Sequence, residues 1–308
     1  MSATLICHAD WSVDAKKRWM TVARLSGGVW RVGAPEPVGA LAGLPERLAE
    51  RAGGGSVALG VDFPIGLPRA FARLHVAAVD FPAFLTWVGP GFFEVCATLD
   101  EVGPGRPFYP ARGVKGMTRA SHAAALGLGG AAGLSRLCDR ATGERPAGAP
   151  LFWTLGANQT GKAAISAWRD LLRPNLGRVA LWPFAGGFLE LLGRHSVVVA
   201  ETYPAEALRQ LGLRLSGSKR RQADRAGVGL LAAVARLGVA EPGLVAAIAE
   251  GFGADAAGED RFDSVLGCLC VLAVVTGRRA DHVPDDPWVR AWEGWVLGQR
   301  AMPINTIS

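Results

Sequence analysis

The sequence predicts an α/β fold in which helices flank a mixed sheet of five strands. Three short apolar runs follow one another near the N-terminus, at residues 3–10, 18–25 and 28–33. The short gaps between them are typical of an antiparallel meander. A fourth run, residues 56–62, is apolar almost throughout and ends in an acid, as in a parallel strand that is buried on both faces. Antiparallel and parallel strands in one chain predict the mixed sheet.

Helices are expected between and after these strands. Residues 41–51 carry apolar side chains at helical spacing and stop before three consecutive glycines, which break a helix. The fifth strand is expected at residues 195–202, and Pro204 suits the first turn of the helix that follows it. The further helix candidates are residues 160–172, 219–237, 241–250 and 260–275.

The middle of the chain is less regular and is rich in Gly, Pro and aromatic residues. No internal repeat or low-complexity linker separates it from the rest. We therefore expect a single domain over residues 1–308. Its core comprises about residues 1–63 and 195–280, and about residues 64–194 form a large insertion between the fourth and fifth strands.

Composition excludes several classes of protein. Hydrophobic residues make up 50% of the chain and charged residues 19%, which excludes disorder as the main state. The longest apolar run, about residues 265–276, is shorter than the roughly 20 residues of a membrane helix. Residues 1–13 include Asp10 and have no basic run before an apolar stretch, which argues against a signal peptide. The five cysteines are scattered, which favours buried thiols over disulfides or a zinc site. We expect a cytoplasmic protein without a membrane partner.

Acidic residues stand at the ends of three predicted strands, namely Asp10, Asp62 and Glu201. Asp260 and Asp263 open the last apolar helix and share one of its faces. Any one of these acids could instead cap a turn or a helix. Ligands of α/β sheets, however, bind beyond the carboxyl ends of strands. If the three strands are neighbours, we expect the acids to meet in one crevice.

Clustered carboxylates repel one another unless a cation lies among them. Carboxylate oxygens are ligands that Mg²⁺ or Mn²⁺ prefer, and two such ions about 4 Å apart catalyse phosphoryl transfer in many enzymes. The five histidines are widely spread and offer no competing transition-metal site. His8 lies on the same side of its strand as Asp10, and a structural role is the favoured interpretation.

Five segments of the chain, in this order, resemble the DUF429 family of predicted ribonuclease H-like nucleases. They are residues 60–68 (GVDFPIGLP), 158–161 (NQTG), 201–204 (ETYP), 260–264 (DRFDS) and 293–295 (EGW). The resemblance implies a ribonuclease H-like arrangement of the sheet. It also implies that Asp10, Asp62 and Asp263 bind the metal, Mg²⁺ or Mn²⁺, with Glu201 as a fourth acid or a substrate-side group. The function it implies is a metal-dependent nuclease, a phosphodiester hydrolase acting on nucleic acid.

One departure from the superfamily concerns the first strand. Ala9 stands where a glycine commonly precedes the aspartate, and Trp11 and Ser12 leave little of the glycine turn that actin-like ATPases use for phosphates. This departure argues against the sugar-kinase and ATPase branch.

Residues 156–162 match the phosphate-loop pattern G-x-x-x-x-G-K. Ala163 stands where a hydroxyl would bind Mg²⁺, so a structural or substrate-facing loop is favoured. A nucleotide-binding phosphotransferase or ATPase is the alternative. Asn158, Gln159 and Lys162 are candidates for contacts with a phosphate or a base.

Basic residues supply further candidates for substrate binding. Lys219 and Arg220 open a predicted helix, where they form either a solvated face or a phosphate-contacting patch. Tyr203 follows Glu201 within the ETYP segment and is a third candidate. The net charge of +6 permits a nucleic-acid partner without requiring one. A non-catalytic nucleic-acid-binding module on the same fold is therefore a further alternative, and the sequence does not indicate an oligomeric state.

Overall fold

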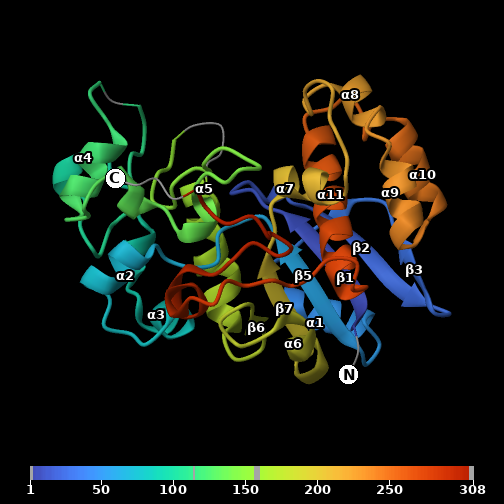
Figure 1. Cartoon of the computed structure of the whole chain (residues 1–308), viewed down its shortest axis with the longest axis horizontal. Helices are drawn as coiled ribbons and strands as arrows, with labels where there is room; N and C mark the ends of the chain where they lie inside the picture. Colours follow the sequence, from blue (N-terminus) through green and yellow to red (C-terminus); the bar gives the residue numbers. More distant parts are fainter. Residues whose placement is uncertain (1–2, 114, 156–159, 305–308) are drawn as a thin grey trace. The chain divides into compact units, whose positions relative to one another are not determined.

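The computed structural model describes residues 3–113, 115–155 and 160–304 (Figure 1). The chain divides into two compact units. Unit 1 comprises residues 1–62, 177–282 and 296–299, and unit 2 comprises residues 63–176, 283–295 and 300–308. Compactness alone does not decide whether either unit folds by itself, so the expected single domain with an insertion stays a prediction.

Unit 1 contains a mixed sheet with eight strands among the described residues, in the order β6-β7-β5-β1-β2-β3-β8, with β4 paired to β2. The five expected strands are β1 (Ala3–Asp10), β2 (Trp19–Ser26), β3 (Val29–Val32), β5 (Ser56–Val61) and β7 (Val197–Glu201). The three others are β4 (Glu36–Pro37), β6 (Ala180–Leu181) and β8 (Val239–Ala240). The α/β fold with a mixed sheet is confirmed. The number of five strands is wrong, because a two-residue strand has no periodicity for a sequence to reveal.

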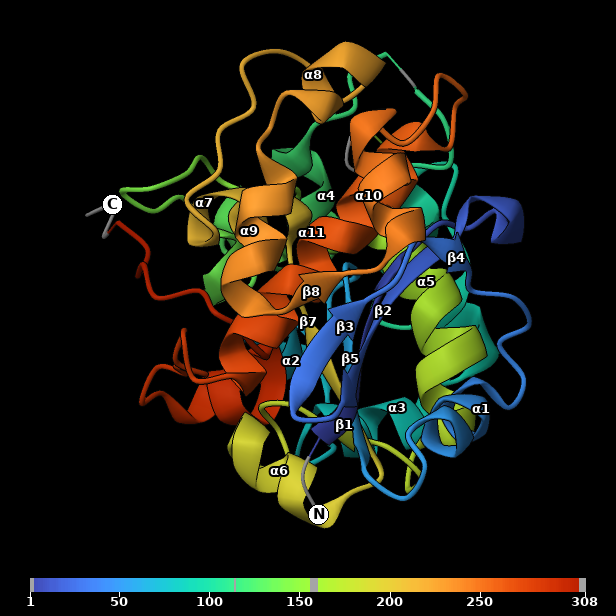
Figure 2. The same ribbon diagram turned by 90° about the vertical axis from the view of Figure 1, so that its right-hand side faces the viewer.

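The strand directions follow the sequence pattern. β1, β2 and β3 pair antiparallel, whereas β5 pairs parallel to both β1 and β7. Every residue of β5 is buried, as expected for a strand covered on both faces. Figure 2 shows the sheet of unit 1 with α11 (Gly258–Val275) on one side and α1 (Leu44–Arg51) on the other.

Helix α11 approaches the sheet closely because a glycine on each side of the contact leaves room for a side chain of the other element. A Cβ atom on Gly60 of β5 would lie 2.6 Å from the side chain of Val271. A Cβ atom on Gly267 of α11 would collide with the ring of His8 on β1. The missing side chains therefore allow α11 to lie directly over β1 and β5, and this contact positions the start of α11 near the ends of these strands.

Five further helices belong to unit 1. They are α6 (Phe188–Arg194), α7 (Pro204–Gln210), α8 (Gln222–Ala226), α9 (Leu230–Leu237) and α10 (Pro242–Ala249). Pro204 begins α7, as predicted. The single helix predicted over residues 219–237 is wrong, because Gly229 takes a φ of +75° and separates α8 from α9.

Unit 2 is built from short helices and turns around aromatic side chains. Its α-helices are α2 (Arg69–His75), α3 (Phe81–Trp87), α4 (Arg119–Ala125) and α5 (Thr160–Ala167). A π-helical turn extends α5 through Leu172, which agrees with the helix predicted there. Phe71, Phe92, Phe108 and Phe152 pack mostly edge to face in its core, an arrangement that aromatic pairs prefer. Within the described ranges, no helix combines the length and apolar character that crossing a membrane requires.

Candidate functional site

The parallel pair β1 and β5 brings two acids together at its carboxyl end. Ala9 lies opposite Val61, so Asp10 and Asp62 come next on their two neighbouring chains. The backbone N–H of Trp11 donates a hydrogen bond to Asp62 Oδ1 at 2.6 Å, and the Asp10 and Asp62 side chains hydrogen-bond to each other. The expected meeting of these two acids is therefore observed.

Helix α11 adds a third acid from its second turn. The Asp263 side chain is buried, with the residue 6% exposed, and Asp10 is 7% exposed. The negative charge of Asp263 acts on both Asp10 and Asp62. We call Asp10, Asp62 and Asp263 the carboxylate cluster. Lys219 is its basic neighbour: Nζ donates a hydrogen bond to Asp263 Oδ2 and lies 3.3 Å from Glu259 Oε1.

Burial and mutual repulsion make full ionisation of the carboxylate cluster unfavourable. Burial raises the pKa of Asp62 to about 7, and the charge of Asp263 contributes. Burial also raises the pKa of Asp263 to about 6, although Lys219 opposes this effect. The pKa of Asp10 is raised well above its usual value by burial and then by the charge of Asp62. Carboxylate oxygens that repel one another are the kind of donor that a hard divalent cation prefers, so the chemistry of these side chains agrees with the expected metal.

Glu201 is not brought into the carboxylate cluster. It pairs with Val61, which in turn pairs with Ala9, so these three side chains lie on one face of the sheet. Gly60 faces α11, so its neighbour Val61 and the paired Glu201 point to the other face of the sheet. Asp10 points to the α11 face, as His8 does two residues before it. Within unit 1, the backbone carbonyl of Glu201 accepts a hydrogen bond from Leu297 N. The catalytic role expected for its side chain stays a prediction.

The described residues among those expected to bind substrate have different surroundings. Lys219 contacts the carboxylate cluster, and its neighbour Arg220 is exposed to solvent. Tyr203 precedes α7 as its N-cap residue. Asn158 and Gln159 lie outside the described residues.

Lys162 belongs to the first turn of α5, in unit 2. A Cβ atom on its neighbour Gly161 would lie 2.7 Å from the backbone oxygen of Leu151. Gly161 is thus required for the packing of α5, which favours the structural interpretation of the phosphate-loop pattern.

Arg225 and Glu259 are absent from the residues that the sequence predicts for the site. Arg225 is 2% exposed, and its guanidinium donates hydrogen bonds to three backbone carbonyls, those of Lys219, Gly251 and Gly253. In sequence it resembles any charged residue of a solvated helix. Glu259 stands four residues before Asp263, and that spacing was the available signal for their shared helix face.

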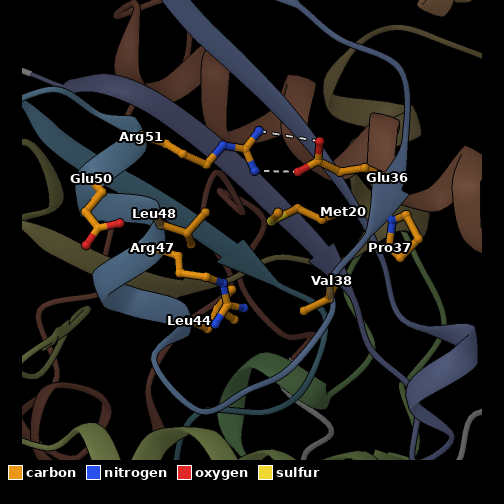
Figure 3. Close-up of a pocket in the computed structure, with 9 residues that line it drawn as sticks. All are labelled: Met20, Glu36, Pro37, Val38, Leu44, Arg47, Leu48, Glu50 and Arg51. Carbon is orange, nitrogen blue, oxygen red and sulfur yellow. Dashed lines mark hydrogen bonds and ion pairs between the residues drawn. The ribbon is translucent and has the colours of Figure 1, made fainter.

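A separate pocket of about 550 Å³ lies in unit 1 beside α1, and we call it the α1 pocket (Figure 3). Apolar side chains from α1 and β2 line it, including Leu44, Leu48 and Met20. Arg51 and Glu36 form an ion pair at one side of it, and Arg47 of α1 also lines it, with its guanidinium donating to the backbone carbonyls of Ala40 and Ala42. None of the residues predicted for the site is among its lining residues.

Comparison with known proteins gives one functional indication. No family model and no solved structure matches the chain. Among curated proteins, the chain is similar to the phosphoenolpyruvate guanylyltransferase of Streptomyces avermitilis, with 41% identity over 108 residues. The match covers 32% of this chain and 48% of the relative, so it spans about half of the relative's length.

This finding corrects the function expected from the sequence. The relative is named for the transfer of a guanylyl group, which is nucleotidyl transfer and not the hydrolysis of nucleic acid. The expectation of a nuclease is therefore wrong. A carboxylate cluster is common to both kinds of reaction, because each occurs at a phosphorus atom whose oxygens carry negative charge. The residues alone do not distinguish between the two reactions.

Proposed function

We propose that the chain is a divalent-cation-dependent nucleotidyltransferase whose reaction takes place at the carboxylate cluster. The observation that carries the proposal is the convergence of Asp10, Asp62 and Asp263, three buried or partly buried acids with raised pKa values. The similarity to a curated guanylyltransferase supports the class of reaction. The donor substrate we propose is a nucleoside triphosphate, GTP in the first instance, and the acceptor is a small phosphorylated acid such as phosphoenolpyruvate.

The proposed reaction forms one phosphorus–oxygen bond and breaks another. An acidic oxygen of the acceptor attacks the α-phosphorus of the triphosphate, and the bond between the α-phosphorus and the bridging oxygen breaks, so that pyrophosphate leaves. Asp10, Asp62 and Asp263 would hold the cation, which when bound supplies positive charge to the phosphate oxygens. The N–H of Trp11 fixes the carboxylate of Asp62, so that this ligand is oriented before the substrates arrive.

We further propose that the sheet of unit 1 has the ribonuclease H-like arrangement and that the chain is related to the DUF429 family. The antiparallel β1–β3 meander, followed by the parallel strands β5 and β7, supports the arrangement. This proposal concerns fold and ancestry only, because one fold carries many reactions.

The test is pyrophosphate release from GTP in the presence of phosphoenolpyruvate and Mg²⁺ or Mn²⁺, with the guanylylated product identified by mass spectrometry. We expect Asp62→Asn to lower the rate by about 100-fold or more, equivalent to ~3 kcal/mol of transition-state stabilisation. Glu50→Gln is the matched control, because it removes an exposed carboxylate of α1 in the same unit. Turnover of other triphosphates, and of related acids in place of phosphoenolpyruvate, defines the substrates. Failure of the wild-type protein to release pyrophosphate from any of the four nucleoside triphosphates would refute the proposal.

A further inference from the structure

Lys219 occupies a position in which two acids of α11 compete for one ammonium group. Glu259 and Asp263 are four residues apart and so share a helix face. Lys219 Nζ contacts a carboxylate oxygen of each, and its side chain is 39% exposed. The Lys219 ammonium therefore neutralises one member of the carboxylate cluster while remaining accessible to solvent.

The backbone of Lys219 is fixed by a buried guanidinium. Arg225 Nη1 donates to the carbonyl oxygen of Lys219 at 2.5 Å. The same side chain donates to the carbonyls of Gly251 at 2.8 Å and Gly253 at 2.6 Å, in the connection between α10 and α11. One side chain thus joins the segment that carries Lys219 to the segment that leads into α11.

The start of α11 is shaped to receive this guanidinium. A Cβ atom on Gly258 would collide with Arg225 Nη2, so the first residue of α11 leaves room that only glycine provides. A second bond, from Gln222 Nε2 to the carbonyl of Glu250 at 2.6 Å, fixes α8 to the same connection. Burying a charged group is costly unless its donors are satisfied, and three carbonyls satisfy Arg225 here. The arrangement fixes the backbone of Lys219, whose side chain is partly exposed.

We propose that Lys219 exchanges partners during the reaction and that Arg225 is the positioning residue that keeps it within reach of both partners. Before the cation binds, Lys219 pairs with both Asp263 and Glu259. Asp263 would instead hold a divalent cation when one is bound, and the positive charge beside it would favour release of the Lys219 ammonium. The released ammonium then binds the phosphate oxygens of the nucleotide, for which lysine acts as a point charge. This inference rests on the proposed function and names the group that recognises the triphosphate.

Two affinities test the exchange, because it predicts that they change in opposite directions. The first is the affinity for Mn²⁺ alone, and the second is the affinity for guanosine 5′-[α,β-methylene]triphosphate with Mg²⁺, both measured by calorimetry. Lys219→Met removes the competing charge, so we expect Mn²⁺ to bind about tenfold more tightly. We expect the nucleotide analogue to bind about tenfold more weakly, because its phosphate partner is gone.

Arg225→Met should change both affinities with the same signs as Lys219→Met but by smaller factors. Arg225→Lys keeps the positive charge but loses the forked arrangement of donors. Its affinities for Mn²⁺ and for the nucleotide analogue should therefore lie between those of Arg225→Met and the wild type. Arg221→Met is the matched control, since Arg221 is exposed and pairs with Asp224. It should change neither affinity. A purely structural role of Arg225 predicts instead that both affinities fall together with the melting temperature.

The outcomes separate this inference from the function on which it rests. If the wild type binds both probes and Lys219→Met leaves both affinities unchanged, the exchange is wrong and the proposed function stands. If Lys219→Met weakens Mn²⁺ binding, the lysine does not compete with the cation, and the exchange is wrong. If neither the wild type nor Lys219→Met binds Mn²⁺ at millimolar concentration, both proposals fall.

Discussion

The two units each bury charged groups, and they balance these charges differently. In unit 2, Arg69 donates to Glu293, which is 0% exposed, and to Asp286, while Arg136 forms a two-pronged pair with Asp139. In unit 1, the carboxylate cluster contains three acids, of which Asp263 pairs with the ammonium of Lys219. Balanced ion pairs stabilise a fold, whereas an excess of one charge calls for an outside partner. The difference supports the proposal that the carboxylate cluster is a place where a cationic ligand binds.

The pKa values of the acids differ in the same way between the paired acids of unit 2 and the carboxylate cluster of unit 1. Although burial opposes it, the hydrogen bond from Arg69 contributes to a lowered pKa of Asp286. In the carboxylate cluster, burial raises the pKa of Asp62 to about 7. An acid with a guanidinium partner is stable in its charged form, and an acid surrounded by other acids is not.

The largest effect is expected from breaking the balanced network of unit 2. Arg69→Met leaves Glu293 buried without its guanidinium, which should lower the free energy of unfolding by about 3–5 kcal/mol. Urea denaturation measures the loss. Arg73→Met, an exposed position on the same helix, should change it by less than about 0.5 kcal/mol. Equal stability of the two variants would show that the network contributes nothing to unit 2.

A divalent cation should stabilise the wild type, because it supplies the charge that the carboxylate cluster lacks. At a Mn²⁺ concentration 100 times the dissociation constant, we expect about 2.7 kcal/mol of added stability, seen as a higher melting temperature. Asp62→Asn should lose most of this gain, and Glu50→Gln should keep it. A melting temperature that Mn²⁺ leaves unchanged would contradict the charge comparison.

Relief of repulsion should be visible without any cation. Asp62→Asn removes one charge while its amide oxygen can still accept the hydrogen bond from Trp11 N–H. We expect the variant to be more stable than the wild type by about 1–2 kcal/mol at pH 8 in a chelator, measured by urea denaturation. A less stable variant would mean that the carboxylate makes favourable contacts that outweigh the repulsion.

The same gain should depend on pH. The folded-state pKa of Asp62 lies above its unfolded value of about 3.8, so the folded state binds more protons between pH 4 and pH 7. Stability of the wild type should therefore fall as the pH rises through this range, and the advantage of Asp62→Asn should shrink toward pH 5. Urea denaturation of both proteins at pH 5 and at pH 8 measures the difference in their free energies of unfolding. A difference that is the same at both pH values would argue against a raised pKa of Asp62.

The strands were predictable where the chain itself carries the signal. Runs such as residues 56–62 are apolar because both faces of β5 are buried, and burial leaves a pattern in sequence. The two-residue strand β6 leaves no such pattern. The break between α8 and α9 depends on one glycine, Gly229, whose positive φ is a property of the folded backbone.

The site was predictable to the extent that strand ends are visible in the sequence. Asp10 and Asp62 follow apolar runs and meet as expected, and Asp263 joins them from the start of α11. Glu201 also ends an apolar run, but the register offsets it by one residue and turns its side chain to the other face. Arg225 donates hydrogen bonds to carbonyls 26 and 28 residues away, and no local sequence pattern predicts such contacts.

The glycine contact between α11 and the sheet has a consequence for the ions that the proposed cation site would accept. Because Gly267 lies against the ring of His8, the depth at which α11 sits determines how far Asp263 stands from Asp10. Mg²⁺ requires oxygen ligands at about 2.0–2.1 Å, and Ca²⁺ accepts about 2.3–2.6 Å. The missing side chain at Gly267 thus sets the spacing of Asp10 and Asp263, and this spacing selects the ionic radius that the proposed site would fit. Gly267→Ala, by lifting the helix, should shift the preference from Mg²⁺ toward Ca²⁺ in a competition titration.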